Sequence, residues 1–431
     1  MKQHQRGRAA VAVAGVLAFG VTACSSKPST TPPAGSPSSG GSTGKTTIVF
    51  AESGLGTEGQ QTQVAINDFM RANPDIKVTV NPLSSDSTTY LQQLENSFIA
   101  GSSTPDVFES DVTYPAKFAQ AGWVLPLDSF SPDMSQYFAV DAAAGVFNGK
   151  TYAVPWFANP EGLFYRTDLI KTPPTTPAQV ISDAQAAMAA DKNLKEGIAF
   201  EGAKYEGAIT SFLTVDSAFG GKLDPNNLNT PGNQAALQFL HDAIFVNKTA
   251  PQAVTGWQEG QVEQEFVAGN AAFAIDYPFV ESSAVGTAVS GSVGYIPFPA
   301  DPTKGGTPGA AVGGEMLAIN AKTKQAAASW KLIQYLTSPS VETARAEATA
   351  DPPSLQSAYT PDLLAKAPYF AQVEELNKDA QARPVNPNYL QVSTDLQTMF
   401  SAVYANQQQP AAALSATATK VKADANATAG P

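Results

Sequence analysis

The hydrophobic positions of the chain follow two different periods in turn. Short apolar runs rich in β-branched residues occur at 46–52 (TTIVFAE), 76–81 (IKVTVN) and 106–110 (DVFES), and they predict β-strands. Between them, residues 60–72 and 90–101 place apolar side chains at helical spacing. This alternation of strand and helix predicts an α/β fold with mostly parallel sheets. In such sheets ligands bind beyond the carboxyl ends of the strands, so the loops that follow the strands are the first places to look for a site.

The alternation begins again after residue 170. Helical patterns and apolar runs follow one another at 177–190, 197–202, 205–221, 233–245, 271–275, 291–299 and 309–320. A chain of 431 residues is also longer than one hydrophobic core usually serves. The sequence therefore predicts two α/β lobes.

The N-terminus is typical of an export signal. Lys2, Arg6 and Arg8 precede an apolar run of about 15 residues, which is too short to span a bilayer comfortably. The run ends in VTAC, and Cys24 is the only cysteine of the chain. We expect residues 1–23 to be a lipoprotein signal peptide and Cys24 to be lipidated; the alternative is an ordinary secreted protein with a buried cysteine. Residues 24–45 are mostly Ser, Thr, Pro and Gly and predict a disordered tether.

Charge and motif content argue against several classes of function. The formal net charge is −12, and removal of the signal would make the chain more acidic, so we expect no nucleic-acid partner. His241 lies in a helical apolar pattern and is expected to be a helix-face residue. Gly54, Gly56 and Gly59 form a G-x-G-x-x-G, but no acidic residue closes the next strand, as a dinucleotide site requires. We expect no cofactor and no metal.

Five segments, taken in order, resemble one protein family. They are GKTYAVPWFANPEGLFYRTDLI (149–170), YEGAITSF (205–212), EGQVEQEFVAGNAAFAIDYPF (259–279), VGGEMLAIN (312–320) and ARPVNPNY (382–389). Together they resemble the bacterial extracellular solute-binding proteins for sugars, and the likeness covers residues 45–425. Within that family the chain is most similar to actinobacterial lipoproteins that supply trehalose to an ABC importer.

The resemblance implies a fold and a role. The fold would be the type II, maltose-binding-protein-like periplasmic-binding-protein fold, with a hinge that the chain crosses three times, near residues 157, 317 and 383. Lobe 1 would comprise 46–157 plus 318–382, and lobe 2 would comprise 158–317 plus 383–425. The protein would be a monomer on the outer face of the cytoplasmic membrane. It would capture a sugar of the trehalose or maltose class and deliver it to the transmembrane subunits of the importer.

The residues expected to bind the sugar combine hydroxyl partners with ring-stacking aromatics. Carboxylates, amides and arginine pair with hydroxyl groups, while aromatic rings cover the apolar faces of a sugar. The expected set is Asp111, Asn159, Tyr205, Glu206, Glu259, Tyr277, Gly313, Gly314 and Arg383. Tyr277 stands where the family often has tryptophan, and the neighbouring Asp276 could also face the cleft.

Each of these residues also has a local explanation. Asp111 could cap a helix, Asn159 could serve a turn, and Glu206 and Glu259 could oppose helix dipoles. The glycine pair could form a plain bulge, and a loop arginine is usually solvated.

Two other functions compete with sugar capture. A secreted glycoside hydrolase would use paired carboxylates such as Asp111 and Glu259. A surface adhesin would show no saturable binding of a small ligand.

Overall fold

The computed structural model describes residues 45–53, 56–84 and 87–428. The expected signal peptide, Cys24, the expected tether up to residue 44 and Gly54 lie outside these residues. Gly56 and Gly59 belong to α1 (Gly56–Ala72), so this helix includes most of the G-x-G-x-x-G segment.

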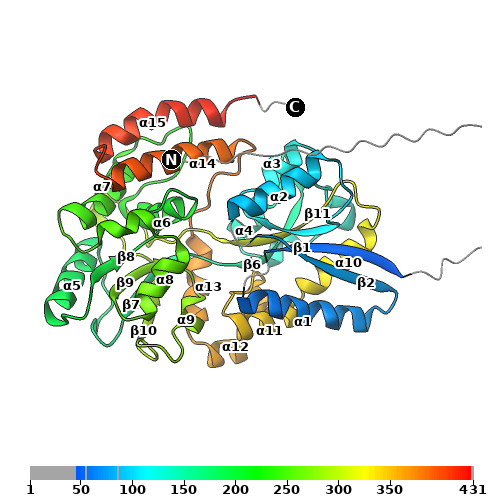
Figure 1. Ribbon diagram of the computed structural model, residues 1–431, viewed down its shortest axis with the longest axis horizontal. Helices are drawn as coiled ribbons and strands as arrows, with labels where there is room; N and C mark the ends of the chain where they lie inside the picture. The colour runs from blue at the N-terminus through cyan, green and yellow to red at the C-terminus, as the bar shows by residue number, and fades with distance from the viewer. Residues whose placement is uncertain (1–44, 54–55, 85–86, 429–431) are drawn as a thin grey trace, which may run out of the picture. The chain divides into compact units, whose positions relative to one another are not determined.

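One sheet has five strands in the order β2-β1-β3-β11-β6 (Figure 1). These strands are β1 (Thr46–Glu52), β2 (Ile76–Pro82), β3 (Val107–Asp111), β6 (Ala153–Ala158) and β11 (Gly314–Ile319). β1 runs parallel to β2 and β3, whereas β11 is antiparallel to both β3 and β6. The prediction of a mostly parallel sheet is therefore wrong here, because β11 enters from a distant part of the chain in the opposite direction.

A second sheet has four strands in the order β10-β7-β9-β8. They are β7 (Gly162–Arg166), β8 (Glu196–Ala199), β9 (Ala271–Asp276) and β10 (Val293–Ile296). Only β8 and β9 are parallel, so this sheet is also mixed. A separate hairpin joins β4 (Val146–Phe147) to β5 (Lys150–Thr151).

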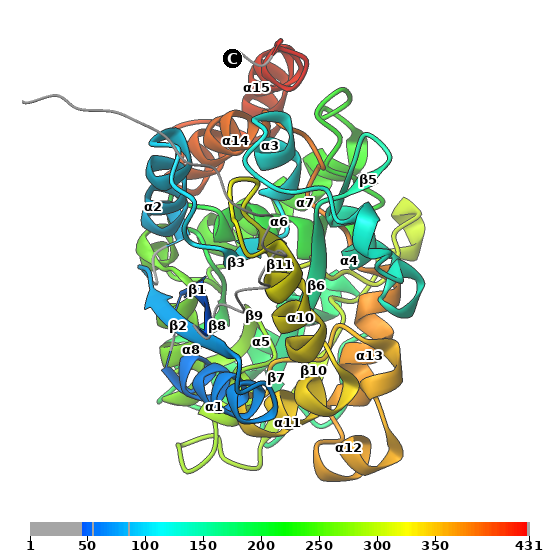
Figure 2. The same cartoon turned by 90° about the vertical axis from the view of Figure 1, so that its right-hand side faces the viewer.

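Helices cover both sheets. Those near the five-stranded sheet are α1, α2 (Ser87–Ile99), α3 (Pro115–Gln120), α4 (Ala139–Ala144), α10 (Ala326–Leu336) and α11 (Pro339–Thr349). Those near the four-stranded sheet are α5 (Pro177–Ala190), α6 (Gly207–Asp216), α7 (Pro231–Phe245), α8 (Glu259–Val267), α9 (Val280–Ser283), α14 (Tyr389–Tyr404) and α15 (Pro410–Ala425). α12 (Pro361–Lys366) and α13 (Phe370–Asp379) complete the α-helices of the described residues. Figure 2 shows α1 beside α11, against which it packs.

Local sequence explains where several helices begin. α5 starts at Pro177 after Thr176, whose hydroxyl accepts a hydrogen bond from the N–H of Gln179. α7 repeats the arrangement with Thr230 before its first proline. Threonine satisfies a free N–H at the helix start, and proline fits the first helical position because it has no N–H to leave unpaired.

Three segments of chain lead from one sheet to the other. They follow β6, precede β11 and follow α13, and they hydrogen-bond to one another through backbone bridges from Glu161 to Ala311 and from Ala311 to Gln381. The second segment ends at Gly314, because all of β11 pairs within the five-stranded sheet. The crossing expected near residue 317 would fall inside that strand.

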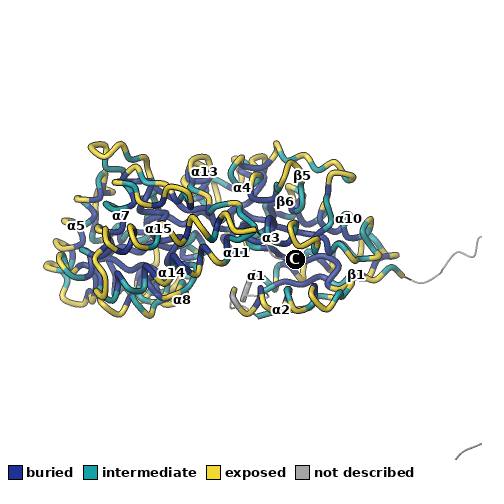
Figure 3. The backbone as a smooth tube through the Cα atoms, turned by 90° about the horizontal axis from the view of Figure 1, so that it is seen from above, coloured by how far each residue is buried: buried dark blue, intermediate teal, exposed yellow. Residues whose placement is uncertain are grey.

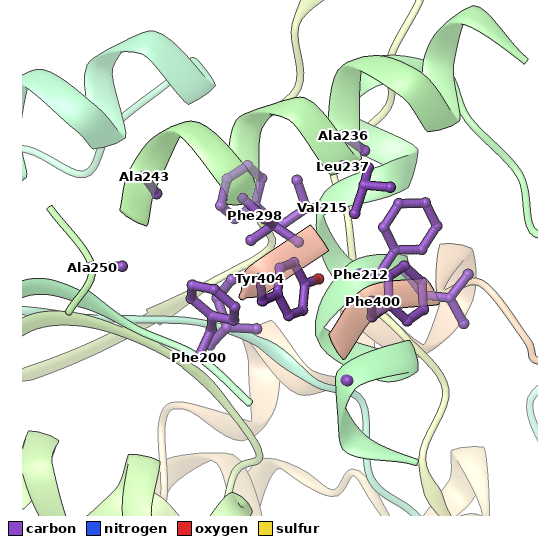
Figure 4. Packing of buried hydrophobic residues seen from close by; sticks show 14 of the residues in the cluster. Phe200, Phe212, Val215, Ala236, Leu237, Ala243, Ala250, Phe298, Phe400 and Tyr404 are labelled. Carbon is purple, nitrogen blue, oxygen red and sulfur yellow. The ribbon is translucent and has the colours of Figure 1, made fainter. Parts of the chain in front are cut away.

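The largest buried apolar cluster lies around the four-stranded sheet and includes the C-terminal helices. Figure 4 shows Phe212 of α6 against Phe400 of α14, with ring centroids 4.9 Å apart, and Phe200 against Tyr404 at 5.5 Å. In Figure 3 the buried positions lie in the interior, and the exposed positions gather along the outer edge of the tube. The core thus fixes α6, which begins at the site described next.

Candidate functional site

A cavity of ≈ 720 Å³ is lined by residues that follow strands of both sheets. This volume lies within the usual range of about 300–1,000 Å³ for small-molecule sites. All nine residues expected from the sequence line it: Asp111, Asn159, Tyr205, Glu206, Glu259, Tyr277, Gly313, Gly314 and Arg383. The structure therefore brings together residues that are up to 272 positions apart in the chain.

Arg383 connects elements on two sides of the cavity. Its side chain is almost fully buried, and its guanidinium donates to Glu206 Oε1 at 3.0 Å and to Asp111 Oδ2 at 3.4 Å. Burial alone would lower the pKa of Arg383, but the two carboxylates raise it well above its usual value. The solvated-loop alternative is wrong for this arginine, and both of its terminal nitrogens are engaged by protein carboxylates.

Glu206 is held by three partners rather than by the start of a helix. Besides Arg383, Tyr389 donates a hydrogen bond to its Oε1 and Ser393 donates one to its Oε2, each at 2.5 Å. Glu206 precedes α6 but its side chain makes no capping hydrogen bond there. The sequence did not single out Tyr389 or Ser393, although Tyr389 ends the segment ARPVNPNY.

Asp111 is the last residue of β3 and supports a turn. Its Oδ1 accepts from the N–H of Thr113 at 2.8 Å and from the Thr113 hydroxyl at 2.6 Å. The residue that caps α3 is Tyr114, without a side-chain bond, so Asp111 is not the cap of that helix.

Asn159, Gly313 and Tyr277 are in close contact. The backbones of Asn159 and Gly313 exchange hydrogen bonds of 3.0 and 3.3 Å. A Cβ atom on Gly313 would lie 2.5 Å from the Asn159 carbonyl oxygen and 2.8 Å from Tyr277 Cε1, so only glycine fits without a shift. The phenol of Tyr277 donates to Thr210 Oγ1 at 3.0 Å. Asn159 lines the cavity, and its amide oxygen Oδ1 is buried without a hydrogen-bond partner among the described residues.

Gly314 combines the expected functional position with a local distortion. Its φ is +107°, a backbone conformation that favours glycine. The pairing of β11 with β6 shifts register one residue later, between Glu315 and Met316. The bulge alternative is thus correct as geometry, and the glycine also lines the cavity.

Glu259 opens α8 next to Tyr205. The phenol oxygen of Tyr205 accepts the backbone N–H of Glu259 at 2.8 Å, and Gln258 with Gln261 caps the helix reciprocally. The carboxyl of Glu259 is therefore not needed as a cap. Burial, with the nearby carboxylates Glu263 and Asp351, raises the pKa of Glu259 to about 7.

Carboxyl groups dominate the cavity wall. The acidic lining residues are Glu109, Asp111, Glu201, Glu206, Glu259, Glu263, Glu315 and Asp351. Arg383 is the one cationic side chain among the lining residues that the structure describes. Asp276, which the sequence placed beside the cleft, is fully buried and does not line the cavity.

Other chemistry is not assembled in the described part of the chain. His241 is buried on α7 and contacts Asp242 and Asn406, as a helix-face histidine. Across residues 45–53, 56–84 and 87–428, no three His, Cys, Asp or Glu side chains are grouped so as to hold a metal ion. Over the same residues, no helix is both long and apolar enough to cross a lipid bilayer.

Comparisons with known proteins agree with this architecture. Residues 53–343 match the sequence profile of the family described as bacterial extracellular solute-binding protein. A probable ABC transporter-binding protein of Deinococcus radiodurans is 31% identical over 359 residues, which is 79% of this chain and 84% of that protein.

Solved structures show the same fold. The maltose-bound MalE3 of T. maritima superposes with a TM-score of 0.80 at 29% identity, covering 88% of this chain and 99% of MalE3. The GacH receptor of Streptomyces glaucescens superposes with a TM-score of 0.79 at 22% identity, covering 88% and 98%. The predicted two-lobed, maltose-binding-protein-like fold is confirmed.

Proposed function

The chain belongs to the family of bacterial extracellular solute-binding proteins, and from this premise we propose that it captures a neutral di- or oligosaccharide of the trehalose or maltose class. It would deliver the sugar to the transmembrane subunits of an ABC importer. The observation that carries the proposal is one cavity lined by carboxylates, an amide, tyrosines and an arginine from both sheets. Hydroxyl groups of a sugar match such acceptors and donors in pairs, and tyrosine rings cover its apolar faces.

The charge of the cavity narrows the class of sugar. Among the residues that the structure describes, eight carboxyl groups and one arginine line it, and that arginine already pairs with Asp111 and Glu206. A sugar phosphate or a uronic acid would bring a further negative charge against these carboxyl groups, and the described lining residues include no second cation to meet that charge. A neutral sugar avoids this repulsion. The maltose bound in MalE3 of T. maritima and the sequence likeness to trehalose receptors support the same class.

Two lobes would close on the sugar. We assign residues 46–157 and the segment from Gly314 to 382 to lobe 1, and residues 158–313 and 383–425 to lobe 2. The three hydrogen-bonded crossing segments support a hinge at this boundary, because all the connections between the sheets then lie side by side. Asp111, Gly314 and Arg383 would contact the sugar from the two sides of that hinge.

Lipid anchoring through Cys24 completes the proposal. Cleavage before Cys24 and its acylation would hold a monomer on the outer face of the membrane, close to the importer. A Cys24→Ala variant should appear in the culture medium and lose incorporation of labelled fatty acid, whereas retention in the membrane fraction would refute the anchor.

A thermal-shift screen against a sugar panel tests the binding function. Trehalose, maltose, maltotriose, glucuronic acid and glucose 6-phosphate are added, and the sugars are recovered afterwards. A ligand at ~100 times its dissociation constant stabilises by ~2.7 kcal/mol, which is about 3 °C for a folded unit of this size. A shift with one neutral sugar, recovered intact, supports the receptor. Cleaved sugar would favour a hydrolase, and a shift only with the anionic sugars would refute the neutral class.

A further inference from the structure

Two glutamates outside the nine-residue set lie together, one of them at the cavity wall and the other behind it. Glu161 follows β6 in the first crossing segment and is fully buried. Glu201 follows β8, is 1% exposed, and lines the cavity. The two carboxyl groups lie close enough to share a hydrogen bond. Such a bond needs one proton, since two carboxylates have no hydrogen to place between them.

The partners of the pair indicate which residue holds that proton. Glu161 Oε1 accepts from Ser211 at 3.0 Å and Glu161 Oε2 accepts from Thr214 at 2.6 Å, so two hydroxyls stabilise Glu161 as the ionised member. Glu201 has no such support, and its buried Oε1 faces no donor among the described residues. We infer that Oε1 of Glu201 carries the proton and donates to Glu161.

The groups around the pair act in the same direction. Burial first, and then the carboxyls of Glu161, Glu259 and Asp276, raise the pKa of Glu201 well above its ordinary value. The phenols of Tyr277, Tyr295 and Tyr404 also lie within the field of Glu161. These side chains come from α8, β9 and the residue after it, β10 and α14, so the pair is surrounded by acids and phenols.

The second oxygen of Glu201 lies at the cavity wall. A Cβ atom on Gly207 would lie only 1.9 Å from Glu201 Oε2 and 2.3 Å from the phenol oxygen of Tyr205. Gly207 and Tyr205 both line the cavity. The missing side chain at Gly207 therefore leaves the space that Oε2 occupies, next to a residue expected to bind the ligand.

We propose that Glu201 is a further ligand-contacting residue, which enters the cavity as a neutral carboxyl hydrogen-bonded to Glu161 and accepts a hydrogen bond from a sugar hydroxyl. This proposal rests on the proposed function. Glu161 then has a positioning role. Ser211 and Thr214 hold its carboxylate in place, and this carboxylate orients the carboxyl group of Glu201. The arrangement offers the sugar an acceptor without adding a negative charge to an acidic cavity.

Two substitutions at position 201 test contact and protonation separately. Glutamine keeps the shape of a protonated glutamate, since its NH₂ donates to Glu161 and its oxygen accepts, whereas leucine removes both bonds. We expect Glu201→Gln to leave the dissociation constant for the sugar within ~3-fold, and Glu201→Leu to weaken binding ~10-fold or more, measured by isothermal titration calorimetry. Glu196→Gln and Glu196→Leu are matched controls, because Glu196 is also buried in β8 but does not line the cavity.

Each outcome of this titration has a defined meaning. Wild-type affinity in Glu201→Leu would overturn the contact. Equal losses in the Gln and Leu variants would overturn the neutral carboxyl, since an ionised glutamate is not replaced by an amide without loss. No sugar binding by the wild-type protein would overturn the proposed function together with the contact.

Unfolding without any sugar tests the shared proton independently. The folded pair holds a proton that a glutamate in the unfolded chain releases above about pH 4.3. Wild-type stability in urea should therefore fall relative to Glu201→Gln as the pH rises from 5 to 8. A difference between the two proteins that stays constant with pH would overturn the shared proton, whatever the sugar panel shows.

Discussion

Replacing Arg383 with methionine tests what holds the two sides of the cavity together. Methionine keeps an unbranched apolar side chain but removes the guanidinium that pairs with Asp111 and Glu206. Both carboxylates are only 22% exposed, so water reaches them poorly. Glu206 would keep its bonds from Tyr389 and Ser393, but neither carboxylate would keep a counter-charge.

The size of the loss follows from the burial of this network. Removing one partner of a buried ion pair typically costs about 3–5 kcal/mol, because the remaining charge stays uncompensated. The partial exposure of the carboxylates and their remaining hydrogen bonds favour the lower end, about 3 kcal/mol. For a folded unit of about 380 residues, with an unfolding entropy of ~2.1 cal/mol/K per residue, this lowers the melting temperature by about 4 °C.

Urea unfolding and calorimetry of the ligand-free protein measure this loss, and titration with the sugar gives the dissociation constant. Arg166→Met is the matched control, because Arg166 is also buried and makes two hydrogen bonds to Asp168 but lies away from the cavity. We expect the control to lose less stability, since the side chain of Asp168 is 40% exposed, and to keep wild-type sugar affinity. Arg383→Met should lose sugar affinity at least ~10-fold.

A charge-neutral variant decides whether the reasoning is right. Asp111→Asn and Glu206→Gln added to Arg383→Met remove the stranded charges while keeping groups of similar shape. Most of the lost stability should then return. A loss below ~1 kcal/mol in the single variant, which is the size for an exposed pair, or no recovery in the triple variant, would refute the account.

Three further substitutions test other parts of the structure. Gly313→Ala should weaken sugar binding ~10-fold or more, because the added Cβ would clash with Asn159 and Tyr277. Gly256→Ala is the control and should bind normally, since its Cβ would meet no atom within 4 Å. Titration calorimetry compares the two variants, and equal affinities would contradict the packing argument. Tyr277→Phe should lose ~3–10-fold in affinity with the hydrogen bond to Thr210, and unchanged binding would show that the ring alone matters. Burial raises the pKa of Asp216 to about 8, so the folded protein holds a proton there and its stability should fall as the pH rises from 5 to 8. Asp216→Asn should flatten this dependence of stability on pH, measured by urea unfolding. The same dependence in the variant and the wild-type protein would contradict the prediction.

The sequence predicted the elements well but not the direction of the strands. β1, β2 and β3 begin and end within one or two residues of the apolar runs, because burial on a sheet produces a local pattern. The antiparallel course of β11 leaves no such mark, since an apolar strand reads the same in either direction. The direction of β11 depends on which side of the five-stranded sheet the chain re-enters from after the second lobe, and this is determined by how the two lobes pack.

The residues of the site divide in the same way. Asp111 and Tyr277 could be found because each ends or follows a strand, where ligands of α/β proteins bind. Glu201 follows β8 in the same manner, and the segment AFEG (199–202) carries the same signal of a carboxylate just beyond a strand. Glu161 could not be predicted from the sequence, since its partners Ser211 and Thr214 lie 50 and 53 residues away and no nearby residue indicates why a glutamate stands there. The sequence predicts that Arg383 donates hydrogen bonds to the sugar. In the structure its guanidinium pairs with Asp111 and Glu206 of the protein itself.

The position of these groups on the crossing segments links the chemistry of the cavity to motion of the lobes. Glu161 lies in the first segment, and its carboxylate accepts hydrogen bonds from Ser211 and Thr214 of α6. Because α6 packs on the same four-stranded sheet that Glu201 follows, rotation about the hinge would leave the Glu161–Glu201 pair intact. Arg383 lies in the third segment and bonds to Glu206 beside α6, but also to Asp111 on β3 of the other sheet. Rotation would therefore change the longer, 3.4 Å contact with Asp111 and spare the 3.0 Å contact with Glu206. When the lobes close on a sugar, the Asp111–Arg383 ion pair must therefore either be kept or be replaced by contacts with the sugar. Glu201 lies beside the four-stranded sheet together with its partner Glu161, so its position at the cavity wall would not change on closure.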